Sequence, residues 1–253
     1  MVAKVYVVTG ASRGLGLGLV AGLMKQDGTV VVAAARNPGK SDALQKLVQQ
    51  YPGRIHTVVL DTEDVASVKD AAASVDSVIP EGVDVLVNMA GIMDDQIVSA
   101  LQTDGSDYMR VLKVNVVGSF LTTQAFYPLL KKRDVRIIVN VSSLLGSIGN
   151  QRAGAVPLVG KAIAYLSSKA ALNMQTAVLA SALKDEGFTV VSTCPGWVAT
   201  DMGSRSDTKE AIGAEPGLTV EQSTEKHLAL ISKLAKHDNG KYISAVEDKE
   251  YPY

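Results

Sequence analysis

Residues 5–16 read Val5-Tyr6-Val7-Val8-Thr9-Gly10-Ala11-Ser12-Arg13-Gly14-Leu15-Gly16. The first four residues are an apolar run of strand length, and three glycines follow at the spacing GxxxGxG. Leu15, Leu19 and Leu23 then recur every four residues, which places them on one face of a helix. Glycines between a strand and a helix let backbone N–H groups approach a pyrophosphate, and the helix N-terminus favours its charge. Alone, such glycines are more often an ordinary turn, but their place at the first strand-to-helix junction favours a phosphate site.

The rest of the chain repeats this alternation of apolar strand-length runs with amphipathic stretches of helix length. Further strands are predicted at residues 30–34, 55–60, 83–87, 135–141, 188–194 and 241–243, and long helices at 106–130 and 163–184. This order buries a parallel sheet between two helical layers. Because no linker or repeat divides residues 1–253, the sequence predicts an α/β fold, a single-domain Rossmann-like doubly wound parallel sheet flanked by helices on both faces.

Residues 203–217 interrupt this regularity because they are rich in polar residues and glycine and lack periodicity. The composition favours a mobile flap over the substrate, and an ordinary surface loop is nearly as well supported.

Composition excludes several classes of partner. The chain has 25 basic and 26 acidic residues, a formal net charge of −1, so no global field draws it to nucleic acid or to an anionic membrane. No apolar stretch is long enough to span a bilayer. The single cysteine, Cys194, lies in an apolar run and is interpreted as structural, and the three histidines show no ligand spacing that indicates a metal. We therefore expect a cytoplasmic protein that binds no nucleic acid, membrane or metal.

The end of the second predicted strand indicates the cofactor. A carboxylate at this position in dinucleotide folds receives the ribose 2′-hydroxyl, whereas an arginine accommodates a 2′-phosphate. Here the sequence is Ala34-Ala35-Arg36-Asn37, with no carboxylate. Arg36, together with Arg13 in the glycine turn, favours NADPH over NADH, although an isolated arginine is more often a solvated surface charge.

Tyr165 and Lys169 lie four residues apart in a predicted helix, so their side chains share a face. A phenol ordinarily titrates near pH 10, and a neighbouring lysine cation lowers that pKa by stabilising the phenolate. A tyrosine and a lysine at this spacing can thus exchange a proton with a substrate, although the pair alone is a weak signal.

Six motifs in sequence order extend this pair into a resemblance to a known family. They are residues 9–16 (TGxxxGxG), 88–91 (close to NNAG), Asn115, residues 141–143 (VSS), Tyr165 with Lys169 (YxxxK), and residues 195–200 (PGxVxT). On these motifs the chain resembles the short-chain dehydrogenase/reductase family over nearly its full length. The combination is highly specific even though no single member is.

The resemblance implies four catalytic residues. Ser143 would hydrogen-bond the substrate carbonyl oxygen, and Tyr165 would donate the proton as hydride arrives. Lys169 would lower the pKa of Tyr165 and hold the ribose hydroxyls, and Asn115 would anchor a water that leads to solvent. The cofactor contacts implied, with the two arginines above, are Gly10, Ser12, Arg13, Gly14, Leu15, Gly16, Arg36, Asp61, Thr62, Asn88, Ala90, Gly91, Tyr165, Lys169, Pro195, Val198 and Thr200.

Two departures from the family pattern bear on the site. Met89 replaces the second asparagine, which matters little where backbone contacts dominate. The gap between Ser143 and Tyr165 is longer than usual, so the loop at 146–162 is expected to reshape the substrate pocket, and Ser142 becomes a competitor of Ser143. The long gap and residues 35–38 most resemble the carbonyl reductase-like subgroup that includes Sniffer, C-factor and fungal ketoreductases.

Three functions remain open at this point. The motifs favour an NADPH-dependent carbonyl reductase or ketoreductase acting on a small-molecule carbonyl substrate. An NAD-dependent alcohol dehydrogenase is opposed by Arg36, and a regulatory dinucleotide-binding protein with little turnover is opposed by the intact proton relay. The family also implies a homodimer or homotetramer, in which helix 163–184 and the helix before it are covered by another subunit.

Overall fold

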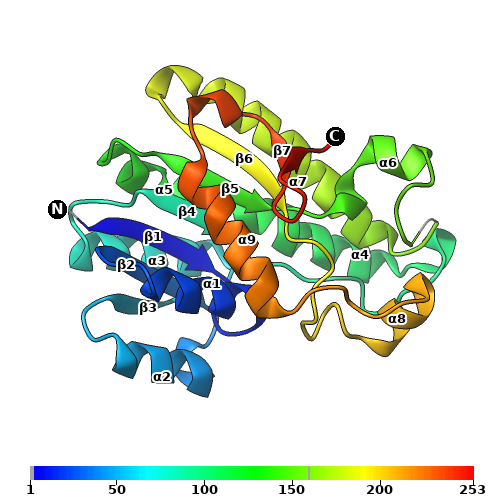
Figure 1. Cartoon of the computed structure of the whole chain (residues 1–253), viewed down its shortest axis with the longest axis horizontal. Helices are drawn as coiled ribbons and strands as arrows, with labels where there is room; N and C mark the ends of the chain where they lie inside the picture. The colour runs from blue at the N-terminus through cyan, green and yellow to red at the C-terminus, as the bar shows by residue number, and fades with distance from the viewer. Residues whose placement is uncertain (1–2, 159) are drawn as a thin grey trace.

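The apolar runs form one central sheet. In the computed structural model, which describes residues 3–158 and 160–253, its strands lie in the order β3-β2-β1-β4-β5-β6-β7-β8 (Figure 1). They are β1 (Lys4–Thr9), β2 (Thr29–Ala35), β3 (Ile55–Val59), β4 (Val85–Asn88), β5 (Ile137–Val141), β6 (Thr189–Cys194), β7 (Tyr242–Ser244) and β8 (Lys249–Glu250). Strands β1 to β7 pair in parallel and β8 is antiparallel to β7. The predicted doubly wound parallel sheet is confirmed, and β8 is an addition that the sequence analysis missed.

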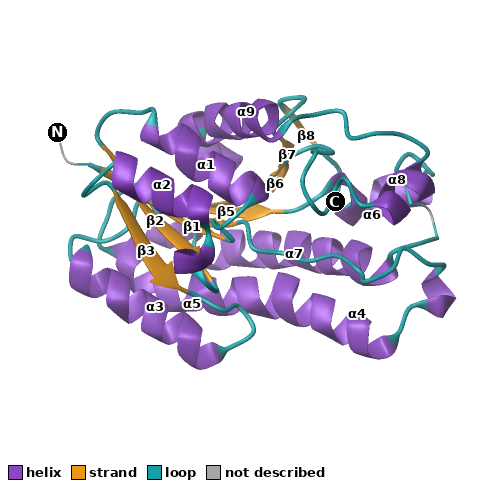
Figure 2. Cartoon of the chain, turned by 90° about the horizontal axis from the view of Figure 1, so that it is seen from below, coloured by secondary structure: helices purple, strands orange, loops and turns teal. Residues whose placement is uncertain are grey.

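Helices cover both faces of the sheet (Figure 2). They are α1 (Gly14–Met24), α2 (Asp42–Gln50), α3 (Val65–Val78), α4 (Gly105–Leu112), α5 (Ser119–Lys131), α6 (Ile148–Arg152), α7 (Ile163–Ala182), α8 (Ser206–Ile212) and α9 (Val220–Lys233). Alternate residues of β1 point to opposite faces, because Tyr6 and Val8 pack with α1 and α9 while Val5 and Val7 pack with α3 and α5. The core is therefore two apolar layers separated by the sheet.

The helix predicted over residues 106–130 is not one regular α-helix. A π-helical stretch, Lys113–Gly118, separates α4 from α5. A π-helical turn adds a residue to the turn and changes no composition, so the apolar periodicity could not locate it. Such turns occur frequently at functional sites, and this one contains Asn115.

Two short helices lie where the sequence analysis predicted none. The segment 203–217, expected to be an irregular flap, contains α8, and Gly213 ends that helix with φ of +73°. The loop expected at 146–162 begins with α6. Helices of five to seven residues are too short to establish a 3.6-residue periodicity, which is why the sequence did not reveal them. Mobility of 203–217 stays a prediction.

The sheet order places a site at one edge. Chain connections run from β1 outward to β3 and then return to β4 on the other side of β1. Ligands of open α/β sheets bind outside the carboxyl ends of the strands at such a switch point. The ends of β1 and β4 therefore mark the place where the predicted site residues should meet.

Candidate functional site

The glycine turn after β1 packs tightly against the turn after β4. Gly10 has φ of +67°, and a Cβ atom there would lie 3.0 Å from Cα of Ala90. A Cβ atom on Gly16 would lie 2.3 Å from the carbonyl oxygen of Gly10. The Thr9 hydroxyl accepts hydrogen bonds from the backbone N–H groups of Met89 and Ala90, both at 3.0 Å. Only glycine fits at the two positions, so the turn can bring its backbone N–H groups to a bound pyrophosphate.

A cleft of about 340 Å³ opens at this junction. Of the predicted cofactor contacts, its walls contain Gly10, Ser12, Arg13, Gly14, Leu15, Gly16, Arg36, Asp61, Thr62, Ala90, Gly91, Tyr165, Lys169, Pro195 and Thr200. These residues come from the ends of β1, β2, β3, β4 and β6 and from α7, and the structure brings them together as the sequence analysis expected.

Two predicted cofactor contacts lie behind the cleft wall. Asn88 is buried, and its side-chain N–H group donates to the Asn140 side chain at 2.8 Å and to the Thr123 hydroxyl at 3.0 Å. Val198 is also buried and forms a β-bridge with Leu218. The side chain of Asn88 therefore joins β4 to β5, and direct cofactor contact by either residue stays a prediction.

The two predicted arginines differ in their surroundings. Arg36 is exposed at the end of β2, and no ion pair of its guanidinium occurs within residues 3–158 and 160–253. Arg13 forms an exposed ion pair with Asp201 at 2.7 Å, across the cleft from the glycine turn. An exposed pair of this kind contributes about 0–1 kcal/mol. Asp201 was missed by the sequence analysis because only the fold brings it opposite Arg13.

Tyr165 and Lys169 lie on successive turns of α7 at the inner end of the cleft. The Lys169 ammonium lies 5.4 Å from the centroid of the Tyr165 ring and donates to the carbonyl oxygen of Val141 at 2.8 Å. Burial lowers the pKa of Lys169 to about 8, and burial raises the pKa of Tyr165 above its ordinary value. Near neutral pH the phenol is therefore protonated and the ammonium is charged.

The structure separates the two candidate serines at the end of β5. The hydroxyl of Ser142 is buried and donates to the carbonyl oxygen of Lys169 at 3.3 Å. The side chain of Ser143 faces the Tyr165 phenol and partly opposes the rise in the pKa of Tyr165, and the Ser143 hydroxyl accepts from the N–H of Leu145 at 3.3 Å. Ser142 does contribute to the cleft wall, but its hydroxyl is already hydrogen-bonded to the backbone of α7. Ser143 is thus the serine whose side chain meets the predicted proton donor.

Asn115 connects the π-helical stretch to the cleft. Its side-chain N–H group donates to the carbonyl oxygen of Ile92 at 2.8 Å and to the Ser168 hydroxyl at 2.9 Å, and its side-chain oxygen accepts from the N–H of Ile92 at 2.8 Å. A Cβ atom on Gly91 would lie 3.3 Å from that oxygen and 3.6 Å from the Lys169 ammonium nitrogen. The amide, the glycine and the lysine therefore converge on one point beside the cleft.

Apolar side chains surround Tyr165 on the side away from the glycine turn. Met93, Leu158 and Ala162 are buried there, and the partly buried members of the cluster are Ile97, Leu145, Tyr165, Leu166, Met202, Ala211 and Ile212. They come from the loop after β4, from the segment between β5 and α7, from α7 itself, and from α8 with the segment before it. Apart from Tyr165, none was predicted individually, because the loops carry no periodic signal.

Comparison with known proteins agrees with this geometry. A family model described as short chain dehydrogenase matches residues 4–211. The chain belongs to the short chain dehydrogenase family. An uncharacterized oxidoreductase of Schizosaccharomyces pombe is 34% identical to it over 254 residues, which cover 95% of each chain. This short chain dehydrogenase is therefore an oxidoreductase with a nicotinamide dinucleotide cofactor.

Solved structures show the same fold over the whole chain. NADPH-bound carbonyl reductase from chicken fatty liver is 33% identical, with a TM-score of 0.86 over all of both chains. Carbonyl reductase Sniffer of D. melanogaster is 29% identical, with a TM-score of 0.87 over all of both chains. Among the described residues of our short chain dehydrogenase, no helix combines the length and hydropathy needed to cross a membrane, and no three His, Cys, Asp or Glu side chains group as metal ligands would.

Proposed function

We propose that this short chain dehydrogenase is an NADPH-dependent carbonyl reductase that acts on a ketone or aldehyde, with Tyr165 as the proton donor. One observation carries the proposal: Tyr165 and Lys169 line the cleft together, with the Lys169 ammonium 5.4 Å from the centroid of the Tyr165 ring, and the Ser143 side chain acts on the same phenol. That arrangement suits proton donation to a carbonyl oxygen and is more than dinucleotide binding requires.

The residues of the cleft fit NADPH. Glycine is required sterically at positions 10 and 16, so the backbone there can approach a pyrophosphate, and the exposed guanidinium of Arg36 is available for a 2′-phosphate. NADPH, when bound, supplies hydride to the carbonyl carbon. NADPH is also the cofactor in the chicken carbonyl reductase structure.

The side chains of this protein then handle the proton. The Ser143 hydroxyl orients the carbonyl oxygen and stabilises its developing negative charge. The protonated Tyr165 phenol donates its proton to that oxygen, and the nearby Lys169 cation stabilises the phenolate that remains. Asn115 fixes the backbone of Ile92 on both its N–H and its C=O, which holds the adjoining Gly91 turn against the lysine.

The apolar cluster around Tyr165 indicates the kind of carbonyl compound. Met93, Leu145, Met202 and Ile212 offer no hydrogen-bonding groups beyond weak sulfur acceptors. A substrate with polar or charged substituents would lose water contacts there without gaining replacements. The proposed substrate therefore has apolar groups beside its carbonyl.

The first test is NADPH consumption by the wild type and by Tyr165→Phe over ketones, diketones, aldehydes and quinones. We expect wild-type turnover to be highest with apolar carbonyls and to fall about 100-fold to 10,000-fold in the variant, because the ring stays and only the proton is lost. NADPH affinity should be unchanged, and it can be followed through the fluorescence of Trp197, the single tryptophan of the sequence, which lies within the 195–200 segment that contains Pro195. Equal turnover in both proteins would contradict the role of Tyr165, and binding without turnover would favour a regulatory function.

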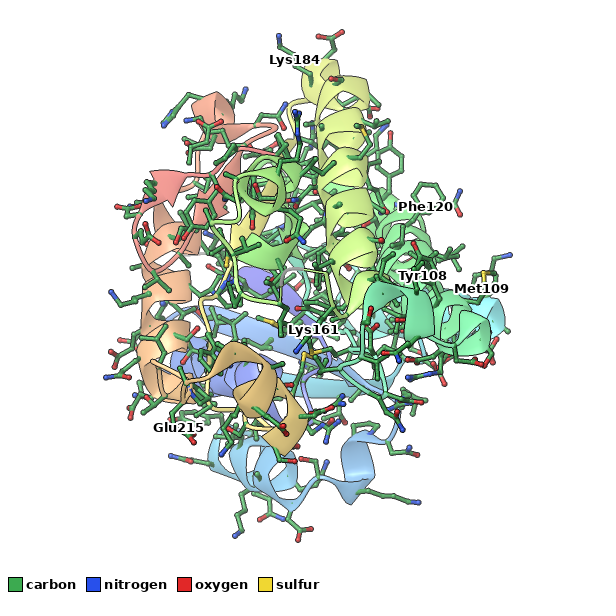
Figure 3. All side chains as sticks on the ribbon, turned by 90° about the vertical axis from the view of Figure 1, so that its right-hand side faces the viewer. Tyr108, Met109, Phe120, Lys161, Lys184 and Glu215 are labelled. Carbon is green, nitrogen blue, oxygen red and sulfur yellow. The ribbon has the colours of Figure 1, made fainter. Side chains whose placement is uncertain are left out.

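We also propose that two or four copies of the chain associate through one outer face. Exposed apolar side chains gather on α4, the π-helical stretch, α5 and α7, with exposed fractions of 42% to 66%: Met109, Val117, Phe120, Met174 and Val178. Figure 3 shows Met109 and Phe120 at the outer side of the helices that carry them. Exposed apolar side chains on neighbouring elements favour contact with another protein surface, here a second copy of this chain.

A further inference from the structure

A buried carboxylate from another part of the chain caps the helix that carries Tyr165. Asp94 is fully buried, and its side chain accepts hydrogen bonds from the N–H of Tyr165 at 2.8 Å and from the N–H of Ala164 at 3.3 Å. The residue that precedes α7, Ala162, has φ of +50° and provides no side-chain cap. Asp94 thus supplies, from 71 residues away, the cap that the helix lacks locally.

The burial of Asp94 indicates that it does more than cap. Burial raises the pKa of Asp94 although three backbone N–H groups oppose the rise. Desolvating a carboxylate is costly, whereas a serine or aspartate next to the helix would satisfy the same N–H groups at the surface. Because Asp94 is buried, its side chain also fixes the distance between the start of α7 and the loop that follows the 88–91 turn.

The same loop is held from its other side by the start of α8. The Arg205 guanidinium donates to the carbonyl oxygen of Asp94 at 2.7 Å and to that of Asp95 at 2.6 Å. It also pairs with Asp207 at 2.5 Å, and the Asp207 carboxylate accepts from the N–H of Ile97 at 3.2 Å. Residues 94–97 are therefore bonded to α7 on one side and to α8 on the other.

This arrangement connects the substrate side of the cleft to the proton donor. Met202 and Ile212, which flank Arg205 in sequence, belong to the apolar cluster around Tyr165. A substrate that packed against them would fix the position of α8, and the hydrogen bonds of Arg205 would transmit that position to the loop that caps α7. Misplacing a reacting group by about 1 Å can cost about 100-fold in rate, so a small shift of this loop is sufficient to matter.

We propose that Asp94 is a positioning residue that sets the place of the Tyr165 phenol, and that Arg205 couples it to the substrate-covering segment around α8. The proposal rests on the proposed role of Tyr165 as proton donor. When α8 packs against a substrate, the Tyr165 phenol is then brought to its final position by the same movement.

The test compares Asp94→Leu with Asp94→Asn, which retains an acceptor oxygen of nearly the same size and place. We expect Asp94→Leu to lower kcat by about tenfold to 100-fold, with KM for the carbonyl substrate and the calorimetric NADPH affinity changed by less than about threefold. Asp94→Asn should recover most of the lost kcat. A purely structural role would instead lower the fraction of enzyme that binds NADPH, without a fall in kcat per binding site.

Arg205→Met tests the other end of the connection and serves if Asp94→Leu does not fold. We expect lower kcat. Where Asp94→Leu folds, adding it to Arg205→Met should cause a smaller further loss than Asp94→Leu causes alone, because the two residues act through one loop. Lys209→Met, on α8 but paired with the exposed Glu215, is the matched control and should behave as wild type.

The outcomes distinguish this proposal from the proposed function. Wild-type kcat in both Asp94→Leu and Arg205→Met, beside an inactive Tyr165→Phe, would overturn the positioning role alone. Full activity of Tyr165→Phe would overturn the proposed function, and with it the role assigned to Asp94.

Discussion

Burial affects the two ionisable side chains of the proposed proton relay in different ways. It favours the neutral phenol of Tyr165 by raising its pKa, and it brings the pKa of Lys169 down to about 8. The family resemblance implied that Lys169 lowers the pKa of Tyr165. In this structure desolvation is the largest influence on the pKa of the phenol, which is held in the protonated state that a donor requires, and stabilisation of its phenolate by Lys169 stays a prediction.

These two shifts predict how carbonyl reduction depends on pH. Lys169 loses its proton as the pH rises through about 8, and a neutral amine no longer stabilises the phenolate that forms on proton transfer. We expect kcat/KM to be level near neutrality and to fall as the pH rises through about 8. The Lys169→Arg variant keeps a positive charge at this position throughout this pH range, so its kcat/KM should not fall as the pH rises through about 8. A level wild-type profile up to pH 9 would count against the role of Lys169.

A second prediction at this scale concerns Arg36. Arg36→Asp should weaken NADPH binding about tenfold to 100-fold, because a charge-assisted hydrogen bond is replaced by repulsion, while NADH binding is retained or improved. Lys40→Asp makes a similar change of charge outside the cleft walls and is the control. Calorimetric titration with both cofactors measures the two affinities. Unchanged discrimination in Arg36→Asp would remove the basis for assigning NADPH.

Residue types and spacing were sufficient to predict most of the residues that line the cleft, but not the buried side chains that hold those residues in place. Tyr165 and Lys169 could be paired because a helix fixes residues four apart on one face. Asp94 could not be predicted, since its partners are backbone N–H groups 70 and 71 residues away and any carboxylate could fill that role. Ser142 and Ser143 are adjacent and chemically identical, so the sequence alone could not tell which of them faces the phenol.

At the scale of single elements, irregular segments determine the shape of the substrate side. The π-helical stretch turns Asn115 toward the cleft, and α8 and the segment before it bring Ile212 and Met202 near Tyr165. Strand and helix positions were predicted to within a few residues wherever the apolar pattern ran for five residues or more. The π-helical turn, α6, α8 and β8 escaped prediction because each is a local departure whose stability comes from tertiary contacts.

A prediction for an element concerns the 3-10 turn Leu144–Gly146, which follows Ser143. A Cβ atom on Gly146 would lie 2.7 Å from both C and Cβ of Lys169. Gly146→Ala should therefore push this turn away from α7, lowering the free energy of unfolding by about 1–3 kcal/mol and also lowering kcat. Thermal unfolding and turnover measure the two effects.

Gly149→Ala is the control for that change. A Cβ atom on Gly149, within α6, would have its nearest neighbour at an ordinary 3.5 Å. The melting temperature and kcat should both stay at wild-type values. Equal behaviour of the two variants would show that Gly146 does not limit the approach of the turn to α7.

At the scale of the whole molecule, the fold followed from the alternation of strands and helices. Parallel strands buried on both faces are nearly continuous apolar runs, and right-handed crossovers leave few ways to order them. Residues from distant parts of the chain met at one cleft because the carboxyl ends of parallel strands share one edge.

The proposed association of chains gives a prediction at this scale. Phe120→Asp should shift the mass in solution toward the single-chain value of 26.6 kDa, because it places a charge in the exposed apolar face. Val65→Asp, another exposed apolar residue at the start of α3, should leave the mass unchanged. Light scattering at micromolar concentration reports both. A wild type that already has the mass of one chain would contradict the proposal.

The short strand β8 has a consequence for the behaviour of the protein at high concentration. It consists of Lys249 and Glu250, both exposed, and it covers the outer side of β7. An uncovered edge strand offers unpaired N–H and C=O groups to any extended peptide, which is a common route to aggregation. Here that position is taken by two charged residues in antiparallel pairing. At high protein concentration this edge of the sheet therefore presents solvated charges, which disfavour the addition of a strand from another molecule.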